Sequence, residues 1–288
     1  MDKIKKLMNN FYYDEVILSN DKVTELREKK NINITRLKDG INKYNADNNT
    51  DYKLHENLEQ GSIAMSTAIE PEYDDFDIDV AIIFEKEKIP SSTDEMKDLI
   101  IDFLKPYNYY FKENPKKKNN CIRIEYQDNY HIDFAVYRVS NGYYEHCGLN
   151  WTERNPRSIN NWFHEQNNLY DDKLRKITRL IKYFSKTRKD WDICGGFIIT
   201  ILVNETLANM TLDVDIDKLL LDAIKSISNR INSNTSVKNP TNNQELINDD
   251  KNKKRLKNLK EKLDEHISDI ENAYLNNDEQ DIKRKWNK

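Results

Sequence analysis

Acidic residues at alternate positions of one predicted strand carry the clearest chemistry in this chain. Asp75, Asp77 and Asp79 lead directly into the apolar run 80–84. Alternate residues of a strand point to the same face, so Asp77 and Asp79 present two carboxylates side by side. A run that is apolar on both faces is typical of a strand inside a covered sheet. Crowded carboxylates repel each other and lose hydration, and a divalent cation such as Mg²⁺ offsets both costs.

A third acid and a glycine–serine pair extend this pattern. Asp133 lies in the alternating segment 130–137, on the face opposite Ile132 and the other apolar residues. Gly61 and Ser62 precede the acids by about fifteen residues, and such a pair lets the backbone approach a phosphate and donate hydrogen bonds to it. A lone Asp-x-Asp is common in solvated turns, whereas this combination favours nucleotidyl transfer at a site for two metal ions.

The same motifs resemble a known family. The pattern G-S-x(4)-T-A-I-x-P from Gly61, the D-x-D at Asp77 and the later H-I-D-F at 131–134 are similar to the bacterial cGAS/DncV-like nucleotidyltransferases. This family, also called CD-NTases or SMODS proteins, belongs to the polymerase-β-like superfamily. The resemblance implies an α+β fold: a nucleotidyltransferase lobe with a central mixed sheet, a long N-terminal spine helix and a C-terminal helical lobe. We expect the catalytic lobe and its spine helix at 1–150, and the helical lobe that closes the nucleotide pocket at 151–288.

A predicted helix at 173–188 carries four cations on one face, namely Arg175, Arg179, Lys182 and Lys186. Their spacing alone favours a solvated face. In the resembled family, however, a lysine in the segment that matches 179–183 contacts the triphosphate of the donor nucleotide. The resemblance therefore assigns Lys182 to phosphate binding.

Gly195 is the second residue that the resemblance implies on the helical side. The family often has P-S-G-F near the start of this helix, and its serine also touches phosphate. Here the stretch reads Cys194-Gly195-Gly196-Phe197, so the hydroxyl is missing. We expect the Gly195 amide to replace that contact in part.

The chemistry expected from these residues is attack of a ribose hydroxyl on the α-phosphorus of a nucleoside triphosphate, with release of pyrophosphate. Two Mg²⁺ ions, or Mn²⁺ in their place, would be held by Asp77, Asp79 and Asp133. Asp133 would hold the ion that activates the hydroxyl, and would either accept its proton or stabilise the alkoxide. The resemblance implies a cyclic di- or trinucleotide second messenger that acts on a downstream effector in antiphage (CBASS-type) defence.

Two other functions fit the same motifs. One is a nucleotidyltransferase that modifies a protein or a small molecule, but such enzymes are generally shorter, and the large C-terminal helical region argues against it. The other is a nucleotide-binding regulator without turnover, and the presence of all three acids disfavours it.

Composition limits the partners and the compartment. The 288 residues carry a net charge of −4 without a long basic tail, so we expect no strong nucleic-acid binding. No apolar run reaches about 18 residues and no signal-peptide pattern is present, so we expect neither a membrane span nor export. Three cysteines without C-x-x-C spacing indicate free thiols in a reducing cytoplasm.

The remaining elements follow from periodicity and capping signals. A long helix is predicted over 20–45, with a break at 31–33, and Ser92 with Glu95 marks a helix start. Segments 121–126 and 130–139 predict a hairpin around 127–129, followed by an edge strand at 143–145. The segment 151–162 marks the crossing into the helical lobe, and the tail 276–288 carries no clear signal. Further helices are predicted at 159–163, 193–207, 215–231 and 251–275.

Overall fold

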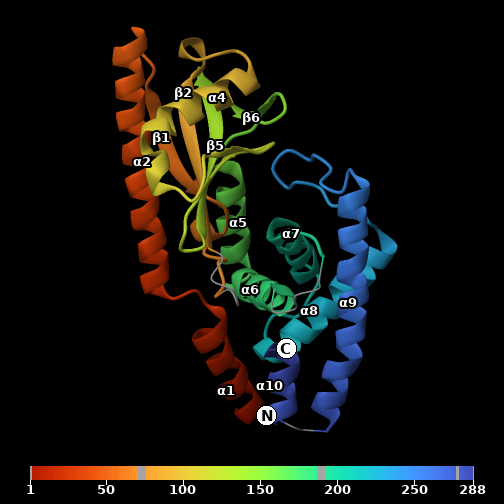
Figure 1. Cartoon of the computed structure of the whole chain (residues 1–288). Coiled ribbons are helices and arrows are strands. Elements are labelled where there is room, and N and C mark those ends of the chain that lie inside the picture. Colours follow the sequence, from red (N-terminus) through yellow and green to blue (C-terminus); the bar gives the residue numbers. More distant parts are fainter. Residues whose placement is uncertain (1, 71–75, 187–191, 277–278, 288) are drawn as a thin grey trace. The chain divides into compact units, whose positions relative to one another are not determined.

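The computed structural model describes residues 2–70, 76–186, 192–276 and 279–287 (Figure 1). The chain divides into two compact units, each built from separate parts of the sequence. One unit comprises Ser19–Ser66 and Tyr73–Asn161, and we call it the sheet unit. The helical unit comprises Met1–Leu18, Thr67–Glu72 and Trp162–Lys288.

The sheet unit is built on a mixed sheet that, in the described part of the chain, has seven strands. The strands are β1 (Leu54–Gln60), β2 (Phe76–Glu85), β3 (Lys116–Lys117), β4 (Ile122–Glu125), β5 (Tyr130–Ser140), β6 (Tyr143–Cys147) and β7 (Trp151–Glu153). They pair in the order β1-β2-β5-β4-β3, and β6 joins β5 to β7. The β2–β5 pair is parallel and the other pairs are antiparallel. Residues 80–84 of β2 are fully buried, which confirms the predicted central strand.

Helices α2 (Asn20–Asn48) and α4 (Thr93–Leu104) pack against each other and contact the sheet. The predicted break of α2 at 31–33 is wrong, because Asn33 is buried and held by neighbours. Its Nδ2 donates to the carbonyl of Lys29 at 2.8 Å, and its Oδ1 accepts from the Tyr126 hydroxyl at 2.5 Å. A tertiary hydrogen bond therefore outweighs the weak helix propensity of asparagine.

Local signals placed several other elements of the sheet unit correctly. The Ser92 hydroxyl caps α4 by accepting from the amide of Glu95, as predicted. The hairpin of β4 and β5 is confirmed, and so is a strand at β6. The predicted edge position of β6 is wrong, because β7 pairs with its other side. Short helical turns complete the unit: α3 (Gly61–Ala64), η2 (Lys86–Lys88) and η3 (Lys105–Tyr110).

The helical unit contains the N-terminal helices and most of the second half of the chain. Its elements are α1 (Asp2–Phe11), the π-helical turn η1 (Tyr12–Val16), the greater part of α5 (Ser158–Leu169), α6 (Lys173–Lys186), α7 (Gly196–Leu207), α8 (Ile216–Ser233), α9 (Asp250–Leu275) and α10 (Glu279–Asn287). Residues 67–70 join this unit through a bridge between Ile17 and Ile69. Two sequence expectations need correction: the helix predicted at 159–163 is the longer α5, and the tail forms α10.

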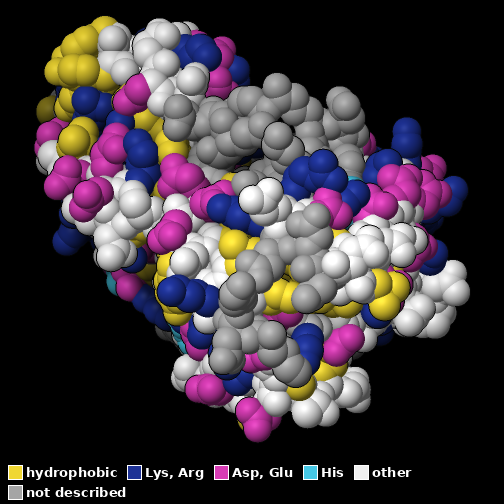
Figure 2. All heavy atoms as spheres, turned by 90° about the horizontal axis from the view of Figure 1, so that it is seen from below, with side chains coloured by type: hydrophobic (Ala, Val, Ile, Leu, Met, Phe, Trp, Pro, Cys, Tyr) yellow, Lys and Arg dark blue, Asp and Glu magenta, His cyan; other side chains and the backbone are white. Residues whose placement is uncertain are grey.

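The exposed side chains and the described helices have the polar character expected from the composition. On the face drawn in Figure 2, acidic and basic side chains are interspersed. Among the described helices, none combines the length and the apolar character that crossing a membrane requires.

Candidate active site

The β2 strand places Asp77 and Asp79 as the sequence predicts. Burial alternates at its start, with Ile78 and Val80 fully buried and the two acids partly exposed on the other face. In the parallel pairing with β5, Asp79 stands in register with Asp133. The fold therefore brings Asp133 beside Asp77 and Asp79 on adjacent strands, although more than 50 residues of sequence separate it from them. Asp75, the first acid of the series, lies outside the described residues.

The electrostatics of this cluster are those of a crowded acidic site. Burial, together with the negative charges of Asp77 and Asp133, raises the pKa of Asp79 to about 7. Arg123 and Arg154 act in the opposite direction without cancelling the effect. Three carboxylates in partial burial therefore carry more negative charge than their surroundings compensate.

Gly61 is required beside Asp79 by both space and backbone conformation. Gln60, the last residue of β1, pairs with Asp79, so the chain turns at Gly61 directly against that side chain. A Cβ atom on Gly61 would lie 1.9 Å from Oδ2 of Asp79. Its φ of 65° is also in the left-handed region that favours glycine.

Ser62 follows in α3 and is partly exposed. Within the described part of the chain, its hydroxyl has no hydrogen-bond partner. The predicted glycine–serine turn therefore lies beside the acids, with its hydroxyl available for a ligand.

Sequence reasoning missed the two arginines of this site. Nε of Arg123 donates to Oδ1 of Asp133 at 2.8 Å, and Nη2 donates to Oδ2 at 2.7 Å. Arg154 follows β7 and acts on Asp79 through its charge. The signal for Arg123 was present: a hairpin centred on residue 128 sets residue 123 opposite residue 133, which is the observed register.

The donor set suits a hard divalent cation, because carboxylate oxygens are the ligands that Mg²⁺ and Mn²⁺ prefer. A bound cation would relieve both causes that raise the pKa of Asp79, its burial and the negative charges of Asp77 and Asp133. In the described part of the chain, no three His, Cys, Asp or Glu side chains already form an ion cage. Asp133 is instead directed to Arg123, so it would have to turn in order to share an ion with Asp79.

Lys182, which the family resemblance assigned to phosphate binding, lies in the helical unit. Its ammonium group donates to the carbonyl of Thr67 at 2.7 Å, and the side chain is only 8% exposed. The solvated face favoured by spacing alone is therefore wrong for this residue. Thr67 lies three residues after the end of α3, so Lys182 binds the segment that continues from the glycine–serine turn.

The neighbouring cations of α6 are also engaged. Arg175 forms an ion pair with Asp172, and Arg179 donates to the hydroxyl of Tyr12 at 3.0 Å. The side chain of Lys186 lies outside the described residues. The three described cations of the predicted stripe, Arg175, Arg179 and Lys182, thus have separate partners and do not form a uniform exposed stripe.

Gly195 caps the start of α7 with an ordinary φ of −68°. A Cβ atom there would meet nothing within 4 Å, so neither space nor conformation demands glycine. The next residue differs, because a Cβ atom on Gly196 would lie 3.1 Å from Cε of Lys182. It is therefore Gly196, and not Gly195, that packs closely against Lys182.

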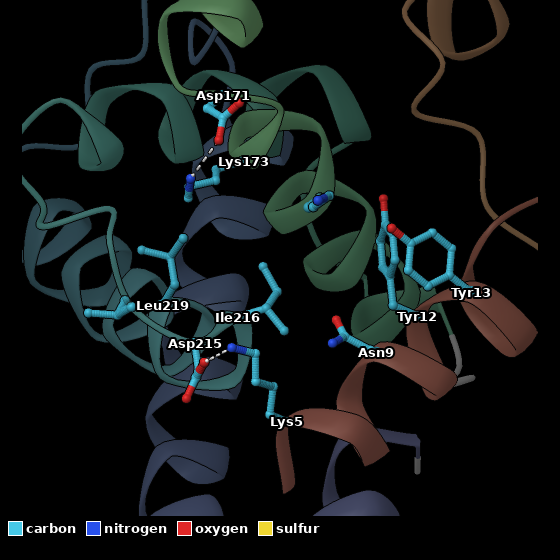
Figure 3. A pocket seen from close by; sticks show the side chains of 11 residues that line it. Lys5, Asn9, Tyr12, Tyr13, Asp171, Lys173, Asp215, Ile216 and Leu219 are labelled. Carbon is cyan, nitrogen blue, oxygen red and sulfur yellow. Dashed lines mark hydrogen bonds and ion pairs between the residues drawn. The ribbon is translucent and has the colours of Figure 1, made fainter. Parts of the chain in front are cut away.

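A pocket in the helical unit is a weaker candidate for a ligand site (Figure 3). Its volume is about 200 Å³, below the roughly 300–1,000 Å³ of most ligand sites. Two of its lysines are paired with acids, Lys5 with Asp215 at 2.9 Å and Lys173 with Asp171 at 3.2 Å. These pairs leave little net charge to attract a triphosphate.

A mixed sheet that gathers three carboxylates beside a glycine–serine turn is the arrangement that the sequence predicts for a nucleotidyltransferase. Residues 56–137 match the family model described as the nucleotidyltransferase domain of cyclic GMP-AMP synthase DncV-like proteins. This segment is thus a DncV-like nucleotidyltransferase domain, and it contains every predicted acid and the glycine–serine turn. The resemblance predicted from the sequence is confirmed.

Solved structures agree over nearly the whole chain. The CdnC:HORMA-deltaN complex of Escherichia coli MS115-1 matches with a TM-score of 0.73 and 15% identity, over 98% of this chain and 95% of that chain. The cyclic AMP-GMP synthase DncV of Vibrio cholerae matches with a TM-score of 0.73 and 16% identity, over 94% and 92%. DncV in complex with the linear intermediate 5′ pppA(3′,5′)pG gives 0.74 and 15%, over 93% and 91%. The whole chain therefore has the cGAS/DncV-like fold, which confirms the predicted fold class.

Proposed function

We propose that this protein joins nucleoside triphosphates into a cyclic di- or trinucleotide that serves as a second messenger. The carrying observation is the cluster of Asp77, Asp79 and Asp133 on adjacent strands, with Asp79 forced against Gly61. Without a cation, repulsion and lost hydration make such a cluster of carboxylates unfavourable in free energy. It therefore suits a reaction that brings metal ions and phosphates together.

Each transfer step exchanges one bond for another. A bond forms between a ribose hydroxyl oxygen and the α-phosphorus, and the bond from that phosphorus to pyrophosphate breaks. Asp77 and Asp79 would hold two Mg²⁺ or Mn²⁺ ions, and Asp133 would share one of them. When bound, these ions neutralise phosphate charge and favour the alkoxide of the attacking group. The Asp133 carboxylate is the group we assign to receive the hydroxyl proton.

The remaining predicted residues would bind the donor triphosphate. Gly61 would supply its amide and Ser62 its hydroxyl next to the acids, and Lys182 would supply a cation from the helical unit. A contact from the Gly195 amide stays part of the proposal. Fixing the donor in this way favours in-line displacement by limiting its motion.

We infer the substrates and the biological role of this protein by analogy with the similar proteins. DncV is a cyclic AMP-GMP synthase and has been seen with a linear dinucleotide intermediate, and CdnC has been seen with ATP. By analogy, we propose nucleoside triphosphates as substrates here and a downstream effector that responds to the product. We place this activity in the cytoplasm, in antiphage defence of the CBASS type. The division into a catalytic lobe at 1–150 and a closing helical lobe at 151–288 belongs to the same proposal.

The test is incubation of the purified chain with labelled ATP, GTP, CTP and UTP in Mg²⁺ or Mn²⁺, followed by separation of the products. We expect phosphatase-resistant cyclic products from the native chain and none from the double variant Asp77→Asn/Asp79→Asn, which should remain folded. Label found on protein or on a small molecule would support a modifying transferase instead. Nucleotide binding without any product would support a regulator.

A further inference from the structure

One of the three acids differs from the other two in its present partner. Both carboxylate oxygens of Asp133 accept hydrogen bonds from Arg123, at 2.8 and 2.7 Å. Asp77 and Asp79 have no ion pair within the described residues. Two acids are therefore open to a cation, whereas the third is already neutralised by a side chain.

The sheet itself maintains this pairing. Residues 123 and 133 stand opposite each other in the antiparallel β4–β5 pair, so their side chains share one face. The Asp133 side chain is 11% exposed and that of Arg123 is 31% exposed, so water weakens the contact only in part. Two parallel charge-assisted hydrogen bonds form a strong pair, and arginine stays protonated at any pH a protein tolerates. Arg123 therefore competes with a metal ion for Asp133 under all working conditions.

We propose that Arg123 is a positioning residue that occupies Asp133 in the metal-free protein and must release it before Asp133 can bind an ion. This inference rests on the proposed function, in which Asp133 is a metal ligand. It follows that ions bind in two unequal classes. The more tightly bound ions are held by Asp77 and Asp79. The more weakly bound ions also need Asp133, so their binding free energy is reduced by the energy needed to separate Asp133 from Arg123.

A nearby arginine separates this effect from simple charge repulsion. Arg154 also acts on Asp79 through its charge, yet it forms no hydrogen bond to the acids in the described structure. The variant Arg154→Gln removes one positive charge near the site and leaves the Arg123–Asp133 contact intact. The variant Arg123→Lys keeps the charge and loses the two-pronged geometry.

The experiment is a titration of the full chain with Mn²⁺ alone, without nucleotide, in which electron paramagnetic resonance measures the free ion. In the native protein we expect one tight and one weak class. Arg123→Gln should tighten the weak class about tenfold or more, since a charge-assisted pair no longer opposes it. Arg123→Lys should tighten it by a smaller factor, and Arg154→Gln should change it less than about twofold. Asp133→Asn should abolish the weak class in the native and the Arg123→Gln backgrounds alike.

Equal shifts in Arg123→Gln and Arg154→Gln would overturn the proposal, because charge alone would then explain them. An unchanged or weakened second class in the Arg123 variants would overturn it as well. Circular dichroism checks that each variant folds. If Arg123→Gln does not fold, Arg123→Lys is compared with Arg154→Gln instead. Failure of the proposed function looks different: Mn²⁺ binding would then be absent, or would persist unchanged in Asp79→Asn.

Discussion

At the scale of single residues, Asp79 bears the largest electrostatic cost in the site. Burial and the charges of Asp77 and Asp133 raise its pKa to about 7, so the folded, metal-free protein disfavours its ionised form. Asp79→Asn removes that cost while keeping the shape of the side chain. We expect the variant to unfold at a higher temperature than the native chain in excess chelator, and to lose the stabilisation that Mn²⁺ gives the native chain. Differential scanning calorimetry with and without Mn²⁺ measures both effects, and a lower melting temperature in chelator would contradict the assignment.

Gly61→Ala tests the close approach of the turn to Asp79. The left-handed φ costs an alanine about 1–2 kcal/mol, and the new Cβ atom must also displace the Asp79 carboxylate. Gly142→Ala is a matched control, because Gly142 has a φ of 81° with nothing within 4 Å of its missing Cβ atom. We expect similar losses of stability from the backbone in both variants. Only Gly61→Ala should lower nucleotidyl transfer, by about a hundredfold, and equal activity in the two variants would refute the close approach.

Lys182→Met tests phosphate binding while keeping most of the buried hydrocarbon. The change removes the donor to the Thr67 carbonyl, so we expect a loss of about 1–3 kcal/mol in the free energy of unfolding. If the ammonium group also contacts phosphate, affinity for a nucleoside triphosphate should fall about tenfold while that for the monophosphate barely changes. Calorimetric titration with both nucleotides separates these effects. A parallel loss for both ligands would mean that Lys182 acts only by holding Thr67 in place.

At the scale of elements, strand β6 of the sheet carries a buried histidine, His146. His146 is 4% exposed, and its Nε2–H donates to the carbonyl of Asn120 at 2.9 Å. Burial, with the positive charge of Arg154 acting in the same direction, lowers its pKa from 6.5 to about 4. The folded protein thus keeps the imidazole neutral at a pH where the unfolded chain would protonate it.

The sign of the resulting pH dependence follows from that difference. Below about pH 6.5 the unfolded chain binds a proton that the folded chain does not, so stability falls as the pH drops toward 4. The histidine contributes roughly 3 kcal/mol to this loss. Urea unfolding at pH 7 and pH 4.5 should show a smaller difference for His146→Gln, which cannot titrate and retains a donor for Asn120. An identical difference in both proteins would contradict the burial argument.

At the scale of the whole molecule, both ends of the chain contribute to the helical unit. Helices α1 and α10 pack together (Figure 1). Lys283 of α10 also pairs with Glu15 of η1 at 2.6 Å. Trp286 in α10 is 2% exposed, with its ring 6.0 Å from that of Phe184 in α6. The tail is therefore part of the core of this unit.

Trp286→Ala should lower the free energy of unfolding by about 3–5 kcal/mol, because it leaves a large cavity. Leu275→Ala, at the exposed end of α9, is the control and should change it by less than about 0.5 kcal/mol. Urea denaturation followed by far-ultraviolet circular dichroism compares the two. Similar small effects would mean that α10 adds little to the unit.

The sequence by itself determined the parts of this protein that depend on neighbouring residues. Alternation placed Asp77, Asp79 and Asp133 on one face of their strands, and the cap at Ser92 and the β4–β5 hairpin follow from local chemistry. These predictions succeeded because strand periodicity and capping act over a few residues. The family motifs likewise lie within residues 56–137, where the family model matches.

Only the tertiary structure decided what depends on residues far apart in the chain. The continuity of α2 depends on a bond from Asn33 to Tyr126, and the burial of Lys182 depends on Thr67. Arg123 became part of the site through its bond across the sheet to Asp133, although its strand was predicted. In each case a polar side chain finds a partner that no local pattern specifies. A buried polar group must be paired, and the fold alone determines which partner comes within reach.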